Sequence, residues 1–197
     1  MTLLFEITDS VANVVLNRPE KLNAINAEMR KAFVDVFQQI ENNPQVKLVI
    51  ISGAGERAFC SGADMTEISG RSGMERRRQI GGDPANIVRA CTKPVIAKLH
   101  GYTLGGGLEL ASACDIRIAA ESAVLGYPEI RHGWLPGGGG GTQTLPRIVG
   151  MGRAMITILT GRRMSAEEAL KYGLVDEVHP DQVLDDAVEQ LANDITR

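Results

Sequence analysis

Residues 93–115, KPVIAKLHGYTLGGGLELASACD, contain the pattern that decides the fold. Residues 94–99 (PVIAKL) form an apolar run of strand length, and residues 101–107 are a turn-rich, glycine-rich segment. We expect a helix over about residues 106–114 and another strand over residues 115–119 (DIRIA). A strand, a helix and a second strand in this order are typical of an α/β protein.

The chain before this stretch continues the alternation. The expected elements are strands over residues 3–8, 11–16 and 46–52 and a helix over residues 27–43. Asn26 is the expected N-cap of that helix, and Pro44 ends it. The last of these strands, VKLVIIS, is almost continuously apolar, as expected for a strand buried on both faces.

The chain after this stretch alternates in the same way. The expected elements are a short strand over 123–126, helical periodicity over 145–160 around Gly150, a short helix between a capping box (Ser165, Glu168) and Gly173, a strand over 174–178, and an acidic amphipathic helix from Asp181. Residues 53–62 are expected to be a glycine-punctuated loop, and residues 66–90 to be irregular and helical only in part. The sequence therefore predicts an α/β fold in one domain over residues 1–197.

Composition excludes several classes of function. A net charge of −3 offers no electrostatic basis for binding nucleic acid, and no apolar run approaches the ~20 residues of a membrane span. The N-terminus does not resemble a signal peptide, so we expect a cytoplasmic protein without a membrane partner. The only cationic cluster, residues 76–78 (RRR), is interpreted as a solvated helix face, with a contact to an anionic ligand such as a nucleotide phosphate as the alternative.

Metal and disulfide sites are not expected. The three cysteines are an odd number without CxxC spacing, which argues against a disulfide framework and against a zinc site. The three histidines are scattered and are interpreted as structural or exposed; they are His100, His132 and His179.

Two glutamates are the candidate chemical groups. Glu109 lies among small and apolar residues, where a carboxylate is costly unless it is paired or functional. An acid at an exposed helix start is an equally good interpretation of Glu109, and a loop acid or salt-bridge partner is the ordinary interpretation of Glu129. Twenty residues separate the two. This spacing lets a helix start and a returning loop bring two carboxylates to one site, where different surroundings could divide acid and base roles.

Backbone N–H groups are the second expected component of a site. Glycines 105–107 precede Glu109, and a glycine turn at a helix N-terminus can aim free N–H groups at a negatively charged atom. The loop over residues 59–64 is a second possible source of such a group, although an ordinary tight turn is the usual interpretation of such a loop. The five glycines at 137–141 are not a phosphate-binding P-loop, because the Gly-Lys-Ser/Thr ending is missing.

Five motifs together resemble the crotonase superfamily, also called the enoyl-CoA hydratase/isomerase superfamily. They are NRPEKLNA (17–24), AFCSGADM (58–65), KPVIAKLHGYTLGGGLELASACD (93–115), GYPEIRHGWLPGGGGGTQTLPRIVG (126–150) and LTGRRMSAEEALKYGLVDEV (159–178). No single motif is decisive, but their order and spacing make a chance match very unlikely. The resemblance implies a spiral of ββα units that assembles as a homotrimer or a dimer of trimers. Family members usually continue for several dozen residues, so it also implies a shortened C-terminal helical segment here.

The resemblance also implies a ligand and a reaction. The substrate class is an acyl-CoA thioester, whose thioester oxygen is held by the backbone N–H groups of Ala63 and Gly106. Family members that carry both glutamates, here Glu109 and Glu129, are hydratases that add water across the 2,3 double bond of an enoyl-CoA. Neither a metal nor a separate cofactor is implied, because coenzyme A enters as part of the substrate.

Other residues are assigned to the coenzyme A path by the same resemblance. They are Asp64, Met65 and Thr66, which follow Ala63, together with Lys21 and Leu22 at the border of the same groove. Trp134, the only tryptophan, either shapes the acyl pocket or is a packed core aromatic.

Three alternatives remain open at this point. Residues 53–58 (GAGERA), with Glu75 further on, match a dinucleotide-binding pattern, although Ser61 and Gly62 would break the helix that this pattern should open. An enoyl-CoA isomerase that moves a proton with one main carboxylate is the alternative within the superfamily. A non-catalytic acyl-CoA-binding subunit is the third.

Overall fold

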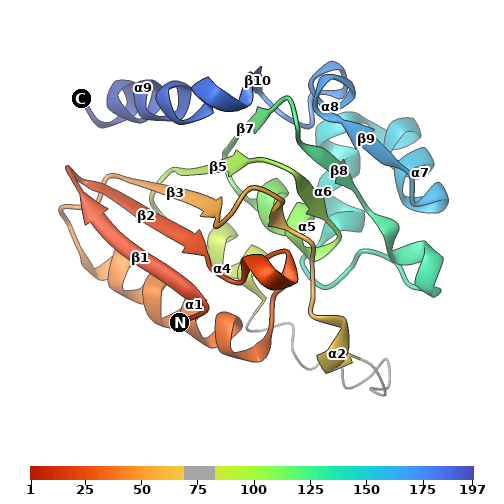
Figure 1. Cartoon of the computed structure of the whole chain (residues 1–197), viewed down its shortest axis with the longest axis horizontal. Helices are drawn as coiled ribbons and strands as arrows, with labels where there is room; N and C mark the ends of the chain where they lie inside the picture. The colour runs from red at the N-terminus through yellow and green to blue at the C-terminus, as the bar shows by residue number, and fades with distance from the viewer. Residues whose placement is uncertain (69–82) are drawn as a thin grey trace.

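The computed structural model describes residues 1–68 and 83–197, and its largest element is a six-stranded sheet in the order β1-β2-β3-β5-β7-β10 (Figure 1). Its strands are β1 (Leu3–Thr8), β2 (Val11–Leu16), β3 (Leu48–Gly53), β5 (Val95–Leu99), β7 (Ile116–Ala120) and β10 (Glu177–His179). β1 and β2 form an antiparallel hairpin, and every other neighbouring pair is parallel. The α/β prediction is confirmed.

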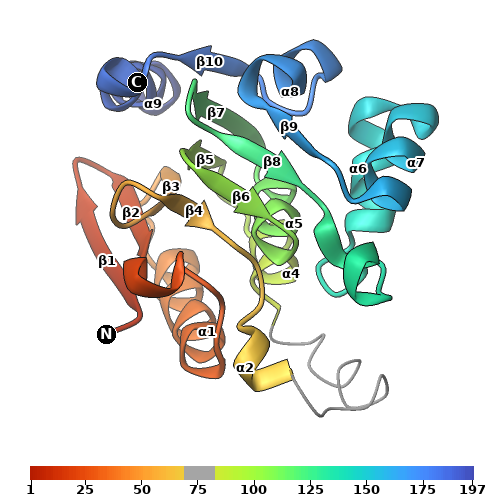
Figure 2. The same cartoon turned by 45° about the vertical axis from the view of Figure 1, so that its right-hand side comes forward.

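A four-stranded sheet has the order β4-β6-β8-β9 (Figure 2). Its strands are β4 (Ala58–Cys60), β6 (Tyr102–Leu104), β8 (Val124–Gly126) and β9 (Arg163–Ser165). The first two pairs are parallel, and β9 runs antiparallel to β8. Each of its first three strands comes a few residues from a strand of the larger sheet along the chain, so the chain passes repeatedly from one sheet to the other.

Helices connect and cover the sheets. The α-helices are α1 (Ala27–Asn42), α2 (Met65–Ile68), α4 (Pro84–Arg89), α5 (Gly106–Ala113), α6 (Gly141–Val149), α7 (Met151–Thr160), α8 (Ala166–Tyr172) and α9 (Leu184–Thr196). The short 3-10 helices are η1 (Pro19–Lys21), η3 (Pro128–His132) and η4 (Asp181–Val183). The described part of the chain contains no helix that is long and apolar enough to cross a membrane.

Side-chain alternation along β3 explains why both faces of the larger sheet are covered. Leu48 packs with α9 residues Leu184 and Val188, whereas Val49 and Ile51 belong to the main core on the opposite face. Successive side chains of a strand point to opposite faces, so an almost continuous apolar run needs a partner on each side. Figure 1 shows α9 and α1 on opposite sides of this sheet. The predicted two-face burial of this strand is confirmed.

Helix α1 begins and packs as its sequence predicts. The Asn26 side chain accepts a hydrogen bond from the N–H of Met29 at 2.9 Å, an N-cap worth about 1 kcal/mol. The rings of Phe33 and Phe37 stack one turn apart, with centroids 5.6 Å apart. The buried side of α1 is thereby fixed against the core, and its N-terminal end lies near the site described below.

Four local expectations need correction. The turn-rich segment expected over residues 101–107 contains the strand β6. The strand expected over residues 174–178 starts only at Glu177, because the N–H groups of Leu174 and Val175 both bond to the carbonyl of Ala169 at the end of α8. The helical stretch over 145–160 is divided into α6 and α7 at Gly150, whose φ is +83°. The expected loop over residues 53–62 contains the strand β4, as its three fully buried residues require.

The same strand overturns the dinucleotide-binding alternative. The pattern in residues 53–58 requires a helix to open at its end, but Ala58 begins β4. Its distant acid, Glu75, and the cationic cluster at 76–78 lie outside the described residues.

Candidate active site

A cavity of about 790 Å³ brings together residues from five parts of the chain. It is lined by the start of α1, the turn after β4, the N-terminal ends of α4 and α5, and the segment from η3 to the glycine run. The lining residues are Ile25, Arg30, Ser61, Gly62, Ala63, Met65, Asp83, Gly105, Gly106, Glu109, Pro128, Glu129, His132, Gly133, Trp134, Leu135, Pro136, Gly137 and Gly138. Both candidate glutamates therefore line the same cavity, as the sequence predicted.

Glu109 is held by the glycine run. It lies in the first turn of α5 and is only 5% exposed, so the alternative of an exposed acid at a helix start is wrong. Its Oε2 accepts a hydrogen bond from the N–H of Gly139 at 2.9 Å, and its Oε1 accepts one from Gly141 at 2.8 Å. A side chain at Gly139 would lie 2.8 Å from the Glu109 Cβ, so the run needs glycine to approach this carboxylate.

Glu129 is held differently. It lies in η3 and is mostly buried, and its Oε2 has no hydrogen-bond partner within the described residues. Its Oε1 packs against Gly105, where an added Cβ would lie 3.0 Å from that oxygen. Gly105 has a φ of +54°, so both its backbone angle and this contact favour glycine.

The surroundings of the two glutamates act differently on their pKa values. Burial, with a smaller contribution from the negative charge of Glu109, raises the pKa of Glu129 to about 7. Burial also raises the pKa of Glu109, but the N–H groups of Gly141 and Gly139 oppose that rise by stabilising the charged form. Glu129 is thus able to hold a proton near neutral pH, while Glu109, whose pKa is also raised, has two N–H donors that favour its charged form.

The backbone nitrogens of Ala63 and Gly106 belong to two segments that approach each other closely beside these acids. A Cβ added to Gly62 would lie 3.1 Å from the nitrogen of Gly106, and one added to Gly106 would lie 3.6 Å from the nitrogen of Ala63. Within the described residues neither Ala63 nor Gly106 donates its N–H to an acceptor. Gly106 is the first residue of α5, where helix geometry leaves the N–H free.

The motif at 17–24 positions one of these donors without entering the cavity. The Asn23 amide, which is fully buried, donates to the carbonyls of Ala54 and Ala58 at 2.9 and 2.8 Å. The next residues tie down the turn after β4, because Ile25 donates to the Gly62 carbonyl at 2.8 Å. Asn23 takes a φ of +54° to make these contacts.

The residues assigned to the coenzyme A path divide into two groups. Ala63 and Met65 line the cavity, and Met65 is 45% exposed. The remaining four are not among the lining residues, and they are Asp64, Thr66, Lys21 and Leu22. Asp64 is instead paired with Arg18 at 2.9 Å and accepts a bond from the Thr66 hydroxyl at 2.7 Å. Leu22 supports the turn after β4, because its carbonyl accepts a hydrogen bond from the N–H of Ser61 at 3.0 Å.

The structure adds residues that sequence reasoning missed. Arg30 and Asp83 form an ion pair in the cavity wall at 3.5 Å, and Arg89 contacts the glycine run. No local signal marks them, since each partner lies about fifty residues away along the chain. Trp134 lines the cavity, so of its two interpretations the pocket role fits and the packed core aromatic does not.

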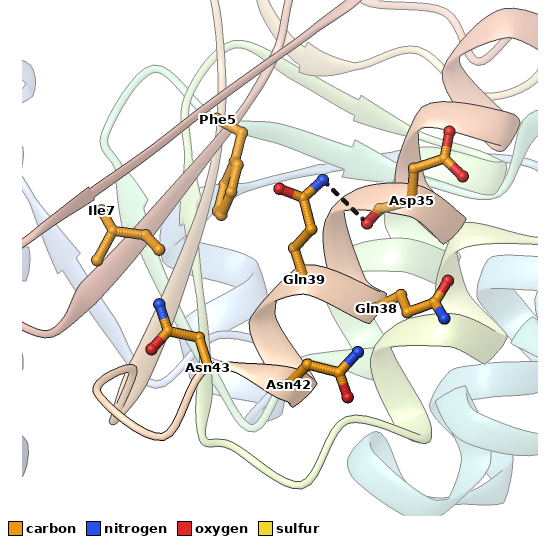
Figure 3. Close-up of a pocket in the computed structure, with 7 residues that line it drawn as sticks. All are labelled: Phe5, Ile7, Asp35, Gln38, Gln39, Asn42 and Asn43. Carbon is orange, nitrogen blue, oxygen red and sulfur yellow. Dashed lines mark hydrogen bonds between the residues drawn. The ribbon is translucent and has the colours of Figure 1, made fainter.

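A second hollow of about 560 Å³ lies between β1 and α1 (Figure 3). Its lining residues are Phe5, Ile7, Asp35, Gln38, Gln39, Asn42 and Asn43. Figure 3 shows amide side chains around it and a single carboxylate, with no facing pair of acids. Across the described ranges 1–68 and 83–197, no group of three or more His, Cys, Asp or Glu side chains is placed to hold a metal ion. The cavity of the two glutamates is therefore the candidate active site.

Comparison with known proteins identifies the family. The sequence profile described as "Enoyl-CoA hydratase/isomerase" matches residues 6–197. The chain belongs to the enoyl-CoA hydratase/isomerase family. The short-chain-enoyl-CoA hydratase of Clostridium acetobutylicum is 42% identical over 98% of this chain and 74% of its own length. The crotonyl-CoA hydratase of Syntrophomonas wolfei is 40% identical over 92% of this chain and 71% of its own length.

Solved structures of the enoyl-CoA hydratase/isomerase family confirm the fold. The enoyl-CoA hydratase of Bacillus anthracis superposes with a TM-score of 0.94 at 40% identity, covering 99% of this chain and 76% of that one. The predicted crotonase fold is therefore confirmed over nearly the whole chain.

Proposed function

We propose that this protein is an enoyl-CoA hydratase that adds water across the 2,3 double bond of a 2-enoyl-CoA thioester. One observation carries the proposal: Glu109 and Glu129, held in different environments, line one cavity with the unpaired N–H groups of Ala63 and Gly106. The names of the Clostridium and Syntrophomonas relatives support a 2-enoyl-CoA as the substrate class.

The two N–H groups would receive the thioester carbonyl oxygen. Attack at C3 moves electron density onto that oxygen and produces an enolate-like state. Donors already in place stabilise such charge in the transition state, typically by about 3 kcal/mol per donor. Ala63 and Gly106 suit this role because their nitrogens belong to rigid elements, the turn after β4 and the first turn of α5.

The two glutamates would divide the proton transfers. Glu109 in its charged form accepts a proton from the water molecule as the water oxygen bonds to C3. Glu129 in its protonated form donates a proton to C2, so one hydroxyl and one hydrogen are added in total. Exchange with solvent after product release returns Glu109 to the charged and Glu129 to the protonated form. The environments described above support this division, because Glu109 receives two N–H bonds and Glu129 has a raised pKa.

An enoyl-CoA isomerase is the second candidate. Glu129 favours it, since a buried carboxyl with a pKa of about 7 and an unpaired oxygen can both take and return a proton. In that reaction one carboxyl would move a proton between C2 and C4 of the acyl chain, with no water added.

The experiment is a hydration assay with crotonyl-CoA and with a longer 2-enoyl-CoA, followed by loss of the conjugated enoyl-thioester absorbance. Glu109→Gln and Glu129→Gln are expected to lower kcat by about 10²–10⁴-fold each. Asp35→Asn, in the hollow of Figure 3, is the matched control and is expected to keep the parent rate. A parent protein that binds acyl-CoA but hydrates neither substrate would refute the proposal, and turnover of a 3-enoyl-CoA would then favour the isomerase.

Assembly as a homotrimer or a dimer of trimers is also a proposal. It is supported by apolar side chains left exposed on one helix, α7; they are Met151, Met155, Ile156 and Leu159, which are 47–66% exposed. Light scattering on the purified protein tests it. The absence of a separate cofactor and a cytoplasmic location also remain predictions.

A further inference from the structure

Arg89, at the end of α4, reaches the glycine run and the first turns of α6 by hydrogen bonds. Its Nη2 donates to the carbonyl of Gly139, and the same nitrogen lies 3.3 Å from the Thr144 hydroxyl. The guanidinium also packs against Gly140, where an added Cβ would lie 3.2 Å from Nη2. Arg89 thus holds both ends of the turn that leads from the glycine run into α6.

The same turn supplies both hydrogen bonds to Glu109. The peptide N–H groups of Gly139 and Gly141 bind the two oxygens of that carboxylate at 2.9 and 2.8 Å. Gly139 therefore donates its N–H to Glu109 and accepts from Arg89 with its carbonyl. A glycine run has more freedom in the backbone than any other sequence, so its geometry depends on such contacts.

We propose that Arg89 is a positioning residue for the reaction. It holds the glycine run in the place from which the run's N–H groups orient Glu109 and stabilise its carboxylate form. This inference rests on the proposed function, in which Glu109 is the base. Arg89 does not line the cavity and would not touch the substrate. Its effect on the position of Glu109 would pass through residues 139–141.

Charge adds to this geometric effect. The Arg89 guanidinium lowers the pKa of Glu109, against the raising effects of burial and of the nearby Asp83 carboxylate. Other ionisable groups near Glu109 are Tyr127, Glu129 of η3 and Arg30 of α1, and Arg30 is already paired with Asp83. Loss of Arg89 would remove both a cation and the support of two N–H donors. The pKa of Glu109 is then expected to rise.

The test compares Arg89→Gln with Arg147→Gln. Arg147 is an exposed arginine of α6 whose hydrogen bonds within the described residues all go to Gln143 of its own helix, so its replacement removes the same charge without touching the glycine run. For Arg89→Gln we expect kcat for crotonyl-CoA to fall by about ten- to a hundredfold with little change in KM, because a misplaced base slows chemistry and not binding. Arg147→Gln is expected to match the parent.

A second readout does not depend on turnover. Carbon-13 NMR of glutamate-labelled protein, with Glu109→Gln used to assign the signal, measures the Glu109 pKa directly. We expect a higher pKa in Arg89→Gln and the parent value in Arg147→Gln. Arg89→Lys keeps the charge but cannot reach both the Gly139 carbonyl and Thr144, so an intermediate kcat is expected.

The outcomes separate this inference from the proposed function. A parent without hydratase activity would refute the function, and the NMR titration would still decide whether Arg89 controls Glu109. Arg89→Gln with parental kcat and a parental Glu109 pKa would overturn the inference. If Arg89→Gln does not fold, Arg89→Lys decides by the same two measurements, and parental values in both would overturn it.

Discussion

Gly139 and Gly141 donate two N–H bonds to the carboxylate of Glu109, whereas Oε2 of Glu129 has no partner among the described residues, although both acids line one cavity. The difference follows from where the chain places them. Glu109 is in the first turn of α5, opposite the glycine run, and Glu129 is in η3, against the bare backbone of Gly105. Two chemically identical side chains thereby acquire different tendencies to hold a proton.

A first prediction concerns the pH dependence of hydration. Glu129 must be protonated to act as the acid, and its pKa is raised to about 7. We therefore expect kcat/KM for crotonyl-CoA to fall as the pH rises above about 7, and to fall on the acid side where Glu109, whose pKa is also raised, takes up a proton, since kcat/KM reports on the free enzyme. Initial rates between about pH 5.5 and 9 measure this. A rate that does not fall on the alkaline side would show that Glu129 is not the proton donor.

A second prediction concerns stability. The folded pKa of Glu129, about 7, lies above the ordinary value of 4.5. The stability from the protonated form is therefore fully present below about pH 4.5 and is lost as the pH rises through 7. Glu129→Gln, which stays neutral, should raise the free energy of unfolding at pH 8 by about 1–3 kcal/mol and change it much less at pH 5.

Urea denaturation at the two pH values measures this effect. Glu121→Gln, which replaces an exposed carboxylate, is the matched control and should leave the free energy of unfolding nearly unchanged at both. An equal effect of Glu129→Gln at pH 8 and pH 5 would contradict the linkage, because it would place the benefit of the amide in packing and not in charge.

Elements with strong local signals could be predicted from the sequence. The hairpin of β1 and β2 matches its predicted bounds, because two β-prone runs flank the turn pair Asp9 and Ser10, which take φ values of +46° and +70°. The N-cap Asn26 was also predicted. The short strands β4, β6 and β9 were missed, since three residues are too few to show an alternating pattern.

The candidate site could be predicted only in part. Glu109, Glu129, Ala63 and Gly106 were found from motif positions, and the structure places all four around one cavity. What the motifs could not give is the contact between the glycine run and Glu109, because a hydrogen bond across thirty residues leaves no local pattern. Asp64 shows the opposite error, since its place next to Ala63 does not bring its side chain into the cavity.

A third prediction tests the close packing of α5 against β4, and compares one glycine of α5 with one glycine of α7. A Cβ added to Gly107 of α5 would lie 2.2 Å from the carbonyl oxygen of Cys60, whereas one added to Gly152 of α7 would have no neighbour within 4 Å. Gly107→Ala should therefore lower the free energy of unfolding by about 1–3 kcal/mol. Gly152→Ala should raise it by up to about 1 kcal/mol, because alanine is the better helix former. Urea denaturation measures both, and equal effects would contradict the contact with Cys60.

A fourth prediction tests the backbone donor of Gly106. Proline suits the first position of a helix, so Gly106→Pro should remove the N–H while α5 still forms. Loss of one donor to the thioester oxygen should lower kcat by about 10²–10³-fold. Gly106→Ala is the matched variant, because it keeps the N–H and its Cβ would have no neighbour closer than 3.6 Å. It should retain far more activity than the proline variant.

Steady-state kinetics with crotonyl-CoA separate the two variants of Gly106, and circular dichroism checks that both are folded. The ratio of their kcat values isolates the N–H, because both add bulk at the same place and only proline removes the donor. Equal kcat values in two folded variants would mean that the Gly106 N–H does not stabilise the developing charge. The oxyanion would then have to be held by Ala63 without help from α5, and the free N–H at the first position of that helix would have no part in the reaction.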